Sequence, residues 1–150
     1  MKPSAPSWRL AKLTTASLVA TAVGFLGAVV NPGPGPRVVK HSLSLGPLYL
    51  PPLLVGLTAL AIAGLVAATG VRWAPATGAA FAAVLMVGAA TLGSAAISYR
   101  LTHPGAIIGF AEDTLQLAGE VIALVAGLGA TVQAYASPTT SWSPRRPRRT

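Results

Sequence analysis

The chain has 150 residues, of which 53% are hydrophobic and 9% are charged, and its formal net charge is +8. Soluble domains carry about a quarter of charged residues, so this composition excludes a water-soluble globular domain and indicates a protein embedded in a lipid bilayer. The sequence contains no cysteine, which excludes disulfide bonds, thiolate nucleophiles and metal sites built on sulfur.

The first apolar segment, residues 13–30, is uncharged and follows Lys2, Arg9 and Lys12. A secretory signal peptide has the same order, but its apolar part is usually about 7–15 residues long and ends at a small-x-small cleavage site. Residues 13–30 form a longer run, which ends in Ala-Val-Val and is followed by Asn-Pro. We therefore predict a retained membrane-spanning helix, preceded by a cytoplasmic segment at residues 1–12.

Three further apolar segments reach the length of about 20 residues that a transmembrane helix needs. They cover residues 48–70, 75–99 and 113–136. Pro51 and Pro52 lie in the first turn of the second predicted helix and Pro75 opens the third, positions where a missing backbone N–H costs little. The sequence thus predicts an all-α fold, a four-helix transmembrane bundle, with residues 13–136 as its membrane domain.

Two outer loops and a tail connect or follow the spans. In residues 31–47 a Pro-Gly start ends the first helix, and alternating apolar positions predict a short strand at Val39, His41, Leu43 and Leu45. In residues 100–113, Gly105 and Gly109 have GxxxG spacing, and we expect an interfacial half-helix that leads into the fourth span. Residues 137–150 are rich in Pro, Ser and Arg, which predicts a disordered, basic cytoplasmic tail.

The basic residues predict how the chain is threaded, because they concentrate on the cytoplasmic side of membrane proteins. Eight lie on one side (Lys2, Arg9, Lys12, Arg72, Arg145, Arg146, Arg148 and Arg149) and three on the other (Arg37, Lys40 and Arg100). Aromatic residues prefer the headgroup level, which suits Trp8, Trp73 and Tyr135 at the inner interface and Tyr49 and Tyr99 at the outer one. Both termini are therefore expected in the cytoplasm, and the location is a cell membrane, in a bacterium the inner membrane.

Small residues predict the faces through which the helices pack, because association in lipid relies on close backbone approach. Such residues recur on one face of the first, second and fourth predicted helices, and the packing residues are Ala16, Ala20, Gly24, Gly56, Gly64, Ala123 and Gly127. The opposite face of the first helix, with Leu18 and Val29, is expected to contact lipid. The third helix carries small residues around most of its circumference and is expected to be the most enclosed.

All three acidic residues of the chain, Glu112, Asp113 and Glu120, belong to the start of the fourth predicted helix. At 100° per residue they share one arc with Gln116 and with the small residues of that helix. Glu120 lies about 10 Å inside the predicted helix and is expected to face the bundle interior. An acid inside a membrane is costly and indicates function by default, while the alternative is a protonated packing residue.

Glu112 and Asp113 allow two interpretations. As the first residues of the predicted helix they would stabilise its free N–H groups and complement its macrodipole. Alternatively, they form an outward-facing mouth that attracts cations above Glu120.

No motif identifies an enzyme or a cofactor, because no Walker sequence, GxSxG, HExxH or dinucleotide fingerprint occurs. The first hypothesis is a noncatalytic accessory or assembly subunit that packs against a membrane-protein partner or a second copy of itself. The alternative is a small oligomeric proton- or cation-coupled transporter or channel, with Glu120 as the titrating site and Gln116, Glu112 and Asp113 as its entry path.

Two further sites are weaker hypotheses. His41 and His103 with Glu112 and Asp113 could form a metal site or an acid-base pair of a membrane enzyme, although their spacing matches no known signature. Arginines at 145–149 are expected to contact anionic lipid. Nucleic-acid binding is not expected, because the positive charge is divided between two membrane faces and no recognition fold is indicated.

Overall fold

The computed structural model describes residues 5–30, 44–45, 48–69, 71–91, 94–102 and 107–136. These residues form the helices α1 (Ala5–Val30), α2 (Leu50–Thr69), α3 (Ala74–Thr91), α4 (Ser94–Thr102) and α5 (Ile107–Ala136), and the two-residue strands β1 (Ser44–Leu45) and β2 (Leu48–Tyr49). Within these ranges, α1, α2, α3 and α5 are long and apolar enough to span a membrane. The predicted helical fold with four candidate spans is confirmed.

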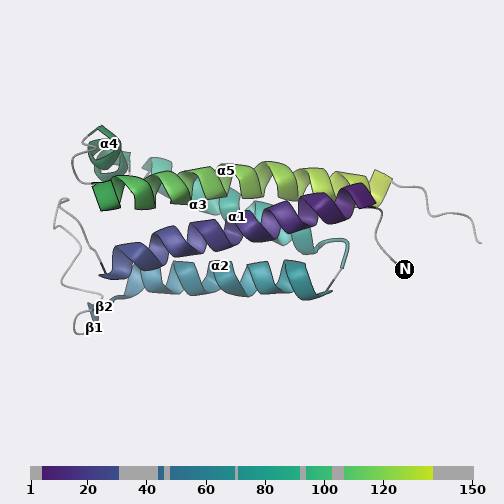
Figure 1. Cartoon of the computed structure of the whole chain (residues 1–150), viewed down its shortest axis with the longest axis horizontal. Coiled ribbons are helices and arrows are strands. Elements are labelled where there is room, and N and C mark those ends of the chain that lie inside the picture. Colours follow the sequence, from purple (N-terminus) through teal and green to yellow (C-terminus); the bar gives the residue numbers. More distant parts are fainter. Residues whose placement is uncertain are drawn as a thin grey trace, which may run out of the picture.

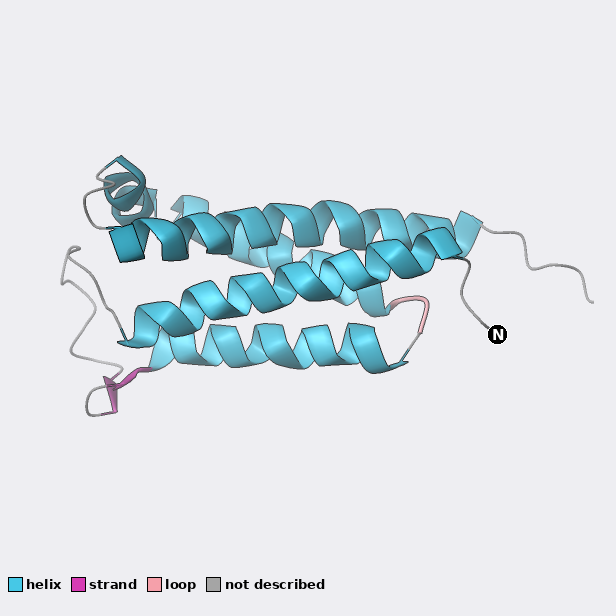
Figure 2. Ribbon diagram, in the orientation of Figure 1, coloured by secondary structure: helices cyan, strands magenta, loops and turns pink. Residues whose placement is uncertain are grey.

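The four long helices run side by side and alternate in direction (Figure 1). The start of α1 and the end of α5 lie at one end of the bundle, which we call the termini end; the opposite end is the far end. Figure 2 shows the turn at residues 71–73 joining α2 to α3 at the termini end, and the antiparallel β1–β2 pair beside the start of α2 at the far end. The predicted positions of Pro51, Pro52 and Pro75 in the first turns of α2 and α3 are confirmed.

Helix α1 is the most enclosed of the four candidate spans. It packs against α5, α2 and α3. Of the residues in its apolar 18-residue stretch, 39% are buried, compared with 28% in the same length of α2 and of α3 and 33% in that of α5. The expectation that α3 is the most enclosed helix is therefore wrong. The predicted lipid face of α1 is also wrong in part, because Leu18 is 0% exposed and Val29 is 6% exposed. A helix with three neighbours buries more of its circumference than its small residues alone can cover.

The core is built mainly from alanine. Leu18, Ala63, Ala82 and Ala123, one residue from each long helix, form a buried cluster, and Ile62, Phe81 and Leu124 pack against it. The outer surface instead carries large apolar side chains, such as Val84, Val125 and Val132. Small residues inside and large apolar residues outside are the arrangement of a bundle whose solvent is lipid, since close backbone contact there replaces hydrophobic burial from water.

Three predicted boundaries differ from the structure. Helix α1 begins at Ala5, so Arg9 and Lys12 lie on the helix rather than in a separate segment before it. The span predicted to end at Tyr99 is two helices, with α3 ending at Thr91 and α4 lying across the far end of the bundle (Figure 1). The sequence of α4, SAAISYRLT, is too polar to continue a span through hydrocarbon.

Helix α5 begins at Ile107, six residues before the predicted start at 113. The predicted half-helix is therefore not a separate element, because residues 107–112 are continuous with the fourth span. Gly105 and the strand predicted at residues 39–43 lie outside the described residues, while Leu45 belongs to β1.

Candidate functional site: a buried polar interface between α1 and α5

Two glycines bring the backbones of α1 and α5 into direct contact. A methyl group placed on Gly24 of α1 would lie 2.9 Å from the carbonyl oxygen of Glu112 and 3.0 Å from Cβ of Gln116. A methyl group on Gly119 of α5 would lie 2.8 Å from the carbonyl oxygen of Ser17 and 2.9 Å from the amide nitrogen of Thr21. Both positions exclude any side chain, because backbone atoms cannot move aside as the end of a flexible side chain can. The two helices are thus antiparallel and in close contact.

The other residues assigned to packing from the sequence are divided between interior and surface. Gly127 of α5 packs on α3, where an added methyl group would lie 2.6 Å from the carbonyl oxygen of Pro75, and Gly56 of α2 packs on Leu26. Ala123 is buried and Ala20 is half-buried. Ala16 and Gly64, in contrast, are exposed, and no atom lies within 4 Å of a methyl group placed on Gly64. The packing assignment does not hold within the chain for these two residues.

Glu120 is fully buried, with 0% of its surface exposed. Gln116, one turn earlier on α5, donates a hydrogen bond from Nε2 to Oε1 of Glu120 over 3.1 Å. The second carboxyl oxygen of Glu120, Oε2, is also buried and has no hydrogen-bond partner within the described part of the chain. The hydroxyl of Thr21, which lies on α1 against Gly119 of α5, is likewise buried and has no hydrogen-bond partner among the described residues. Buried oxygens without partners are costly, so these two are where a proton or a water molecule would be stabilised.

Glu112 and Asp113 lie in the second turn of α5, and the first turn of that helix contains no acidic residue. The interpretation that they cap the helix is therefore wrong, because only the first four N–H groups of a helix lack partners within it. Both side chains turn toward the bundle instead. Asp113 is buried, and a methyl group on Gly27 of α1 would lie 2.7 Å from Oε1 of Glu112.

The buried polar side chains of the described residues all belong to α1 and α5. They are Thr14, Ser17 and Thr21 on α1 and Asp113 and Glu120 on α5. Thr14 contacts α3, since a methyl group placed on Gly78 would lie 3.0 Å from its Cγ2. The other four, together with Glu112 and Gln116, form what we call the α1–α5 polar interface. Because the helices are antiparallel, the α5 residues extend from the far end toward the middle of the bundle, and Thr14 lies beyond Ser17 toward the termini end.

The buried hydroxyls of α1 differ in their bonding. Thr14 donates to the carbonyl oxygen of Leu10 over 2.9 Å, and Ser17 donates to that of Leu13 over 2.7 Å. Thr21 does not form the equivalent bond. Sequence reasoning did not include Thr14 in the inner face of the first helix, although its spacing of three residues from Ser17 and seven from Thr21 places it there.

The histidine sites are not tested, since His41 and His103 lie outside the described residues, as do the arginines at 145–149. Among the residues that are described, no group of three His, Asp or Glu side chains could hold a metal ion. No family model, curated protein or solved structure matches the chain.

The contact at Gly119 predicts a loss of stability on adding one methyl group. Gly119→Ala should lower the free energy of unfolding by about 1–3 kcal/mol, because the methyl group meets backbone atoms of α1. Gly88→Ala in α3 is the matched control: nothing lies within 4 Å of the added methyl group, so stability should stay the same or rise by up to about 1 kcal/mol. Unfolding of both variants in detergent micelles measures the difference. Equal stability of the two variants would contradict the α1–α5 contact.

Proposed function

We propose that this chain is an integral membrane protein that works by binding and releasing a proton at Glu120. The observation that supports this proposal is the fully buried carboxyl group whose Oε2 has no hydrogen-bond partner among the described residues. Ionisable residues inside membrane proteins are rare and mark ion or proton pathways more often than other sites. The activity class that fits is a small proton-coupled transporter or channel.

The packing of the polar interface favours a proton over a metal cation. The backbones of α1 and α5 touch at Gly24 and Gly119, which leaves no space between them for a hydrated ion. A proton needs only groups that accept and donate it, and carboxyl groups recur at Glu112 and Glu120, two turns apart on one face of α5. Gln116 lies between them and fixes Oε1 of Glu120.

Protonation also supplies a means of coupling to movement. A charged carboxylate is far more costly to bury than a neutral carboxyl group, so a change of protonation at Glu120 alters the free energy of the closed α1–α5 contact. The protonated form fits the buried position, because no described basic side chain is bonded to Glu120. The ionised form favours separation of α1 from α5 and entry of water.

The substitution Glu120→Gln tests this function. It keeps the shape and the capacity for hydrogen bonding but removes the titrating group, so proton flux into liposomes that contain the purified protein should be abolished. Thr114→Val, a substitution on the exposed side of α5, is the matched control and should keep the flux of the unmodified protein. Equal flux in the unmodified protein and in Glu120→Gln would exclude a proton pathway through Glu120.

We further propose that the termini end lies in the cytoplasm of a plasma membrane. Of the four described basic residues, Arg9, Lys12 and Arg72 belong to this end and Arg100 belongs to α4 at the far end; the exposed rings of Trp8, Trp73 and Tyr135 also belong to the termini end (Figure 1). Basic residues concentrate on the cytoplasmic side, and aromatic rings gather at the headgroup level. A single cysteine replacing Arg72 should then react with an impermeant reagent from the cytoplasmic side only. Reaction from the outside would show that the termini end faces away from the cytoplasm.

A second candidate function is assembly with another membrane protein through α2. Ala61, Gly64 and Ala68 form an exposed patch of small residues, which we call the α2 patch. Most other packing glycines contact a neighbouring helix of the chain, whereas Gly64 contacts none. Small residues spaced by three and four positions allow a second transmembrane helix to approach closely. The α2 patch therefore suits an accessory or assembly subunit, with a partner chain or a second copy as its neighbour.

Gly64→Leu tests the assembly function. The added side chain would hold a neighbouring helix away, so association in a bilayer should weaken by roughly 1 kcal/mol, about fivefold. Gly88→Leu introduces the same side chain on α3, again where nothing lies within 4 Å of Cβ, and should leave association unchanged. Energy transfer between labelled chains measures both. Association that is insensitive to Gly64→Leu would remove the basis for this function.

A further inference from the structure

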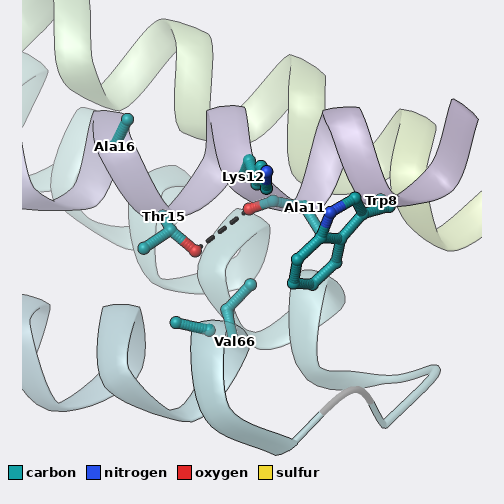
Figure 3. A pocket seen from close by; sticks show the side chains of 7 residues that line it. Trp8, Ala11, Lys12, Thr15, Ala16 and Val66 are labelled. Carbon is teal, nitrogen blue, oxygen red and sulfur yellow. Dashed lines mark hydrogen bonds between the residues drawn. The ribbon is translucent and has the colours of Figure 1, made fainter. Parts of the chain in front are cut away.

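A pocket of about 290 Å³ lies between α1 and α2 at the termini end (Figure 3). Its walls include Trp8, Ala11, Lys12 and Thr15 from α1 and Val66 and Ala67 from α2. The pocket exists because the alanines leave space where the two helices meet. The hydroxyl of Thr15 donates to the carbonyl oxygen of Ala11 over 3.0 Å (Figure 3), so the wall offers little unused hydrogen-bonding capacity apart from the Lys12 ammonium group.

Lys12 places a positive charge at this pocket. Its Nζ lies 5.1 Å from the centre of the Trp8 ring, a distance at which a cation is attracted to the face of an aromatic ring. No acidic side chain among the described residues pairs with it. Glu120 is the nearest acid along the bundle, since its neighbour Gly119 contacts Ser17, five residues from Lys12. Glu120, however, is fully buried and hydrogen-bonded within α5, whereas Lys12 is exposed. The ammonium group therefore keeps its charge available for an anion.

The level of the pocket in a membrane follows from α2. Its 20 residues give a length of about 30 Å, which matches the hydrocarbon thickness of a typical bilayer. Val66 and Ala67 lie in the last turn of α2, which ends at Thr69. The apolar part of the pocket thus lies at the edge of the hydrocarbon, and Lys12 is at the level of the lipid headgroups, with the exposed Trp8 ring beside it.

We propose that this pocket binds an anionic phospholipid, with one acyl chain between α1 and α2 and the headgroup phosphate at the Lys12 ammonium group. An apolar wall and a single cation at headgroup depth match the two parts of such a lipid. A free phosphate ion would leave the apolar wall uncovered. A packed helix of another protein would not need the cation. The site consists of residues of α1 and α2 and does not depend on the role of Glu120.

Binding can be measured by native mass spectrometry of the full chain, delipidated in detergent and titrated with phosphatidylglycerol or with phosphatidylcholine. The unmodified protein should retain phosphatidylglycerol more tightly. Lys12→Ala should weaken retention of phosphatidylglycerol about fivefold and that of phosphatidylcholine less, because its choline group already offsets the charge of the phosphate. Ala67→Phe, which fills the pocket, should weaken retention of both lipids.

Two matched controls separate the pocket from its surroundings. Arg9→Ala removes a neighbouring charge of α1 outside the pocket wall, and Ala68→Phe adds the same ring one residue away from it; both should retain lipid as the unmodified protein does. Inorganic phosphate at the same concentration should not displace the lipid. Three results would overturn the proposal: unchanged retention in Lys12→Ala, unchanged retention in Ala67→Phe, or displacement of the lipid by inorganic phosphate.

Discussion

The close contact of α1 with α5 is the constraint on which the rest of the structure depends. Gly24 on one helix and Gly119 on the other each face backbone atoms of the partner helix at distances that exclude a side chain. In lipid, apolar surface gives helices little reason to associate, so stability comes from close packing and from hydrogen bonds between polar groups. The two glycine contacts provide the first and position the polar groups for the second. Helix α1, which also packs on α2 and α3, is thereby fixed at the centre of the bundle.

The same contact explains how a carboxyl group can be buried at Glu120. A polar side chain on the outer surface of the bundle would face lipid. Glu120 is instead enclosed by helices and receives a hydrogen bond from Gln116. Its other oxygen and the hydroxyl of Thr21 have no partner among the described residues, which leaves part of the cost of burial uncompensated. A native structure that keeps such a cost is consistent with a functional requirement for the carboxyl group.

The arrangement of α5 could be predicted from the sequence because two independent patterns coincide there. The acids and Gln116 share an arc with Ala123 and Gly127, and the large residues Val121, Val125 and Leu128 take the opposite side, where they are exposed. On α1 the same reasoning failed for Leu18, because the periodicity of one helix cannot tell how many neighbours it has. It failed for Gly64 too, since a small residue on a helix face does not reveal whether its neighbour belongs to the same chain. The capping role of Glu112 and Asp113 depended on the start of α5, which apolar runs locate only within several residues.

The most direct test of the central contact uses the absence of cysteine in the natural sequence. At position 27 of α1 the three atoms nearest an added Cβ all belong to the side chain of Glu112, with its Cγ at 3.1 Å. A cysteine at position 112 places its sulfur near that Cγ, so the two Cβ atoms come within about the 3.5–4.5 Å that a disulfide requires. The double variant Gly27→Cys with Glu112→Cys, oxidised in a bilayer, should form an intramolecular disulfide nearly completely. Gly88→Cys with Glu112→Cys should not, because no atom lies within 4 Å of Cβ at position 88. No disulfide between positions 27 and 112, or equal yields from both pairs, would contradict the packing of α1 on α5.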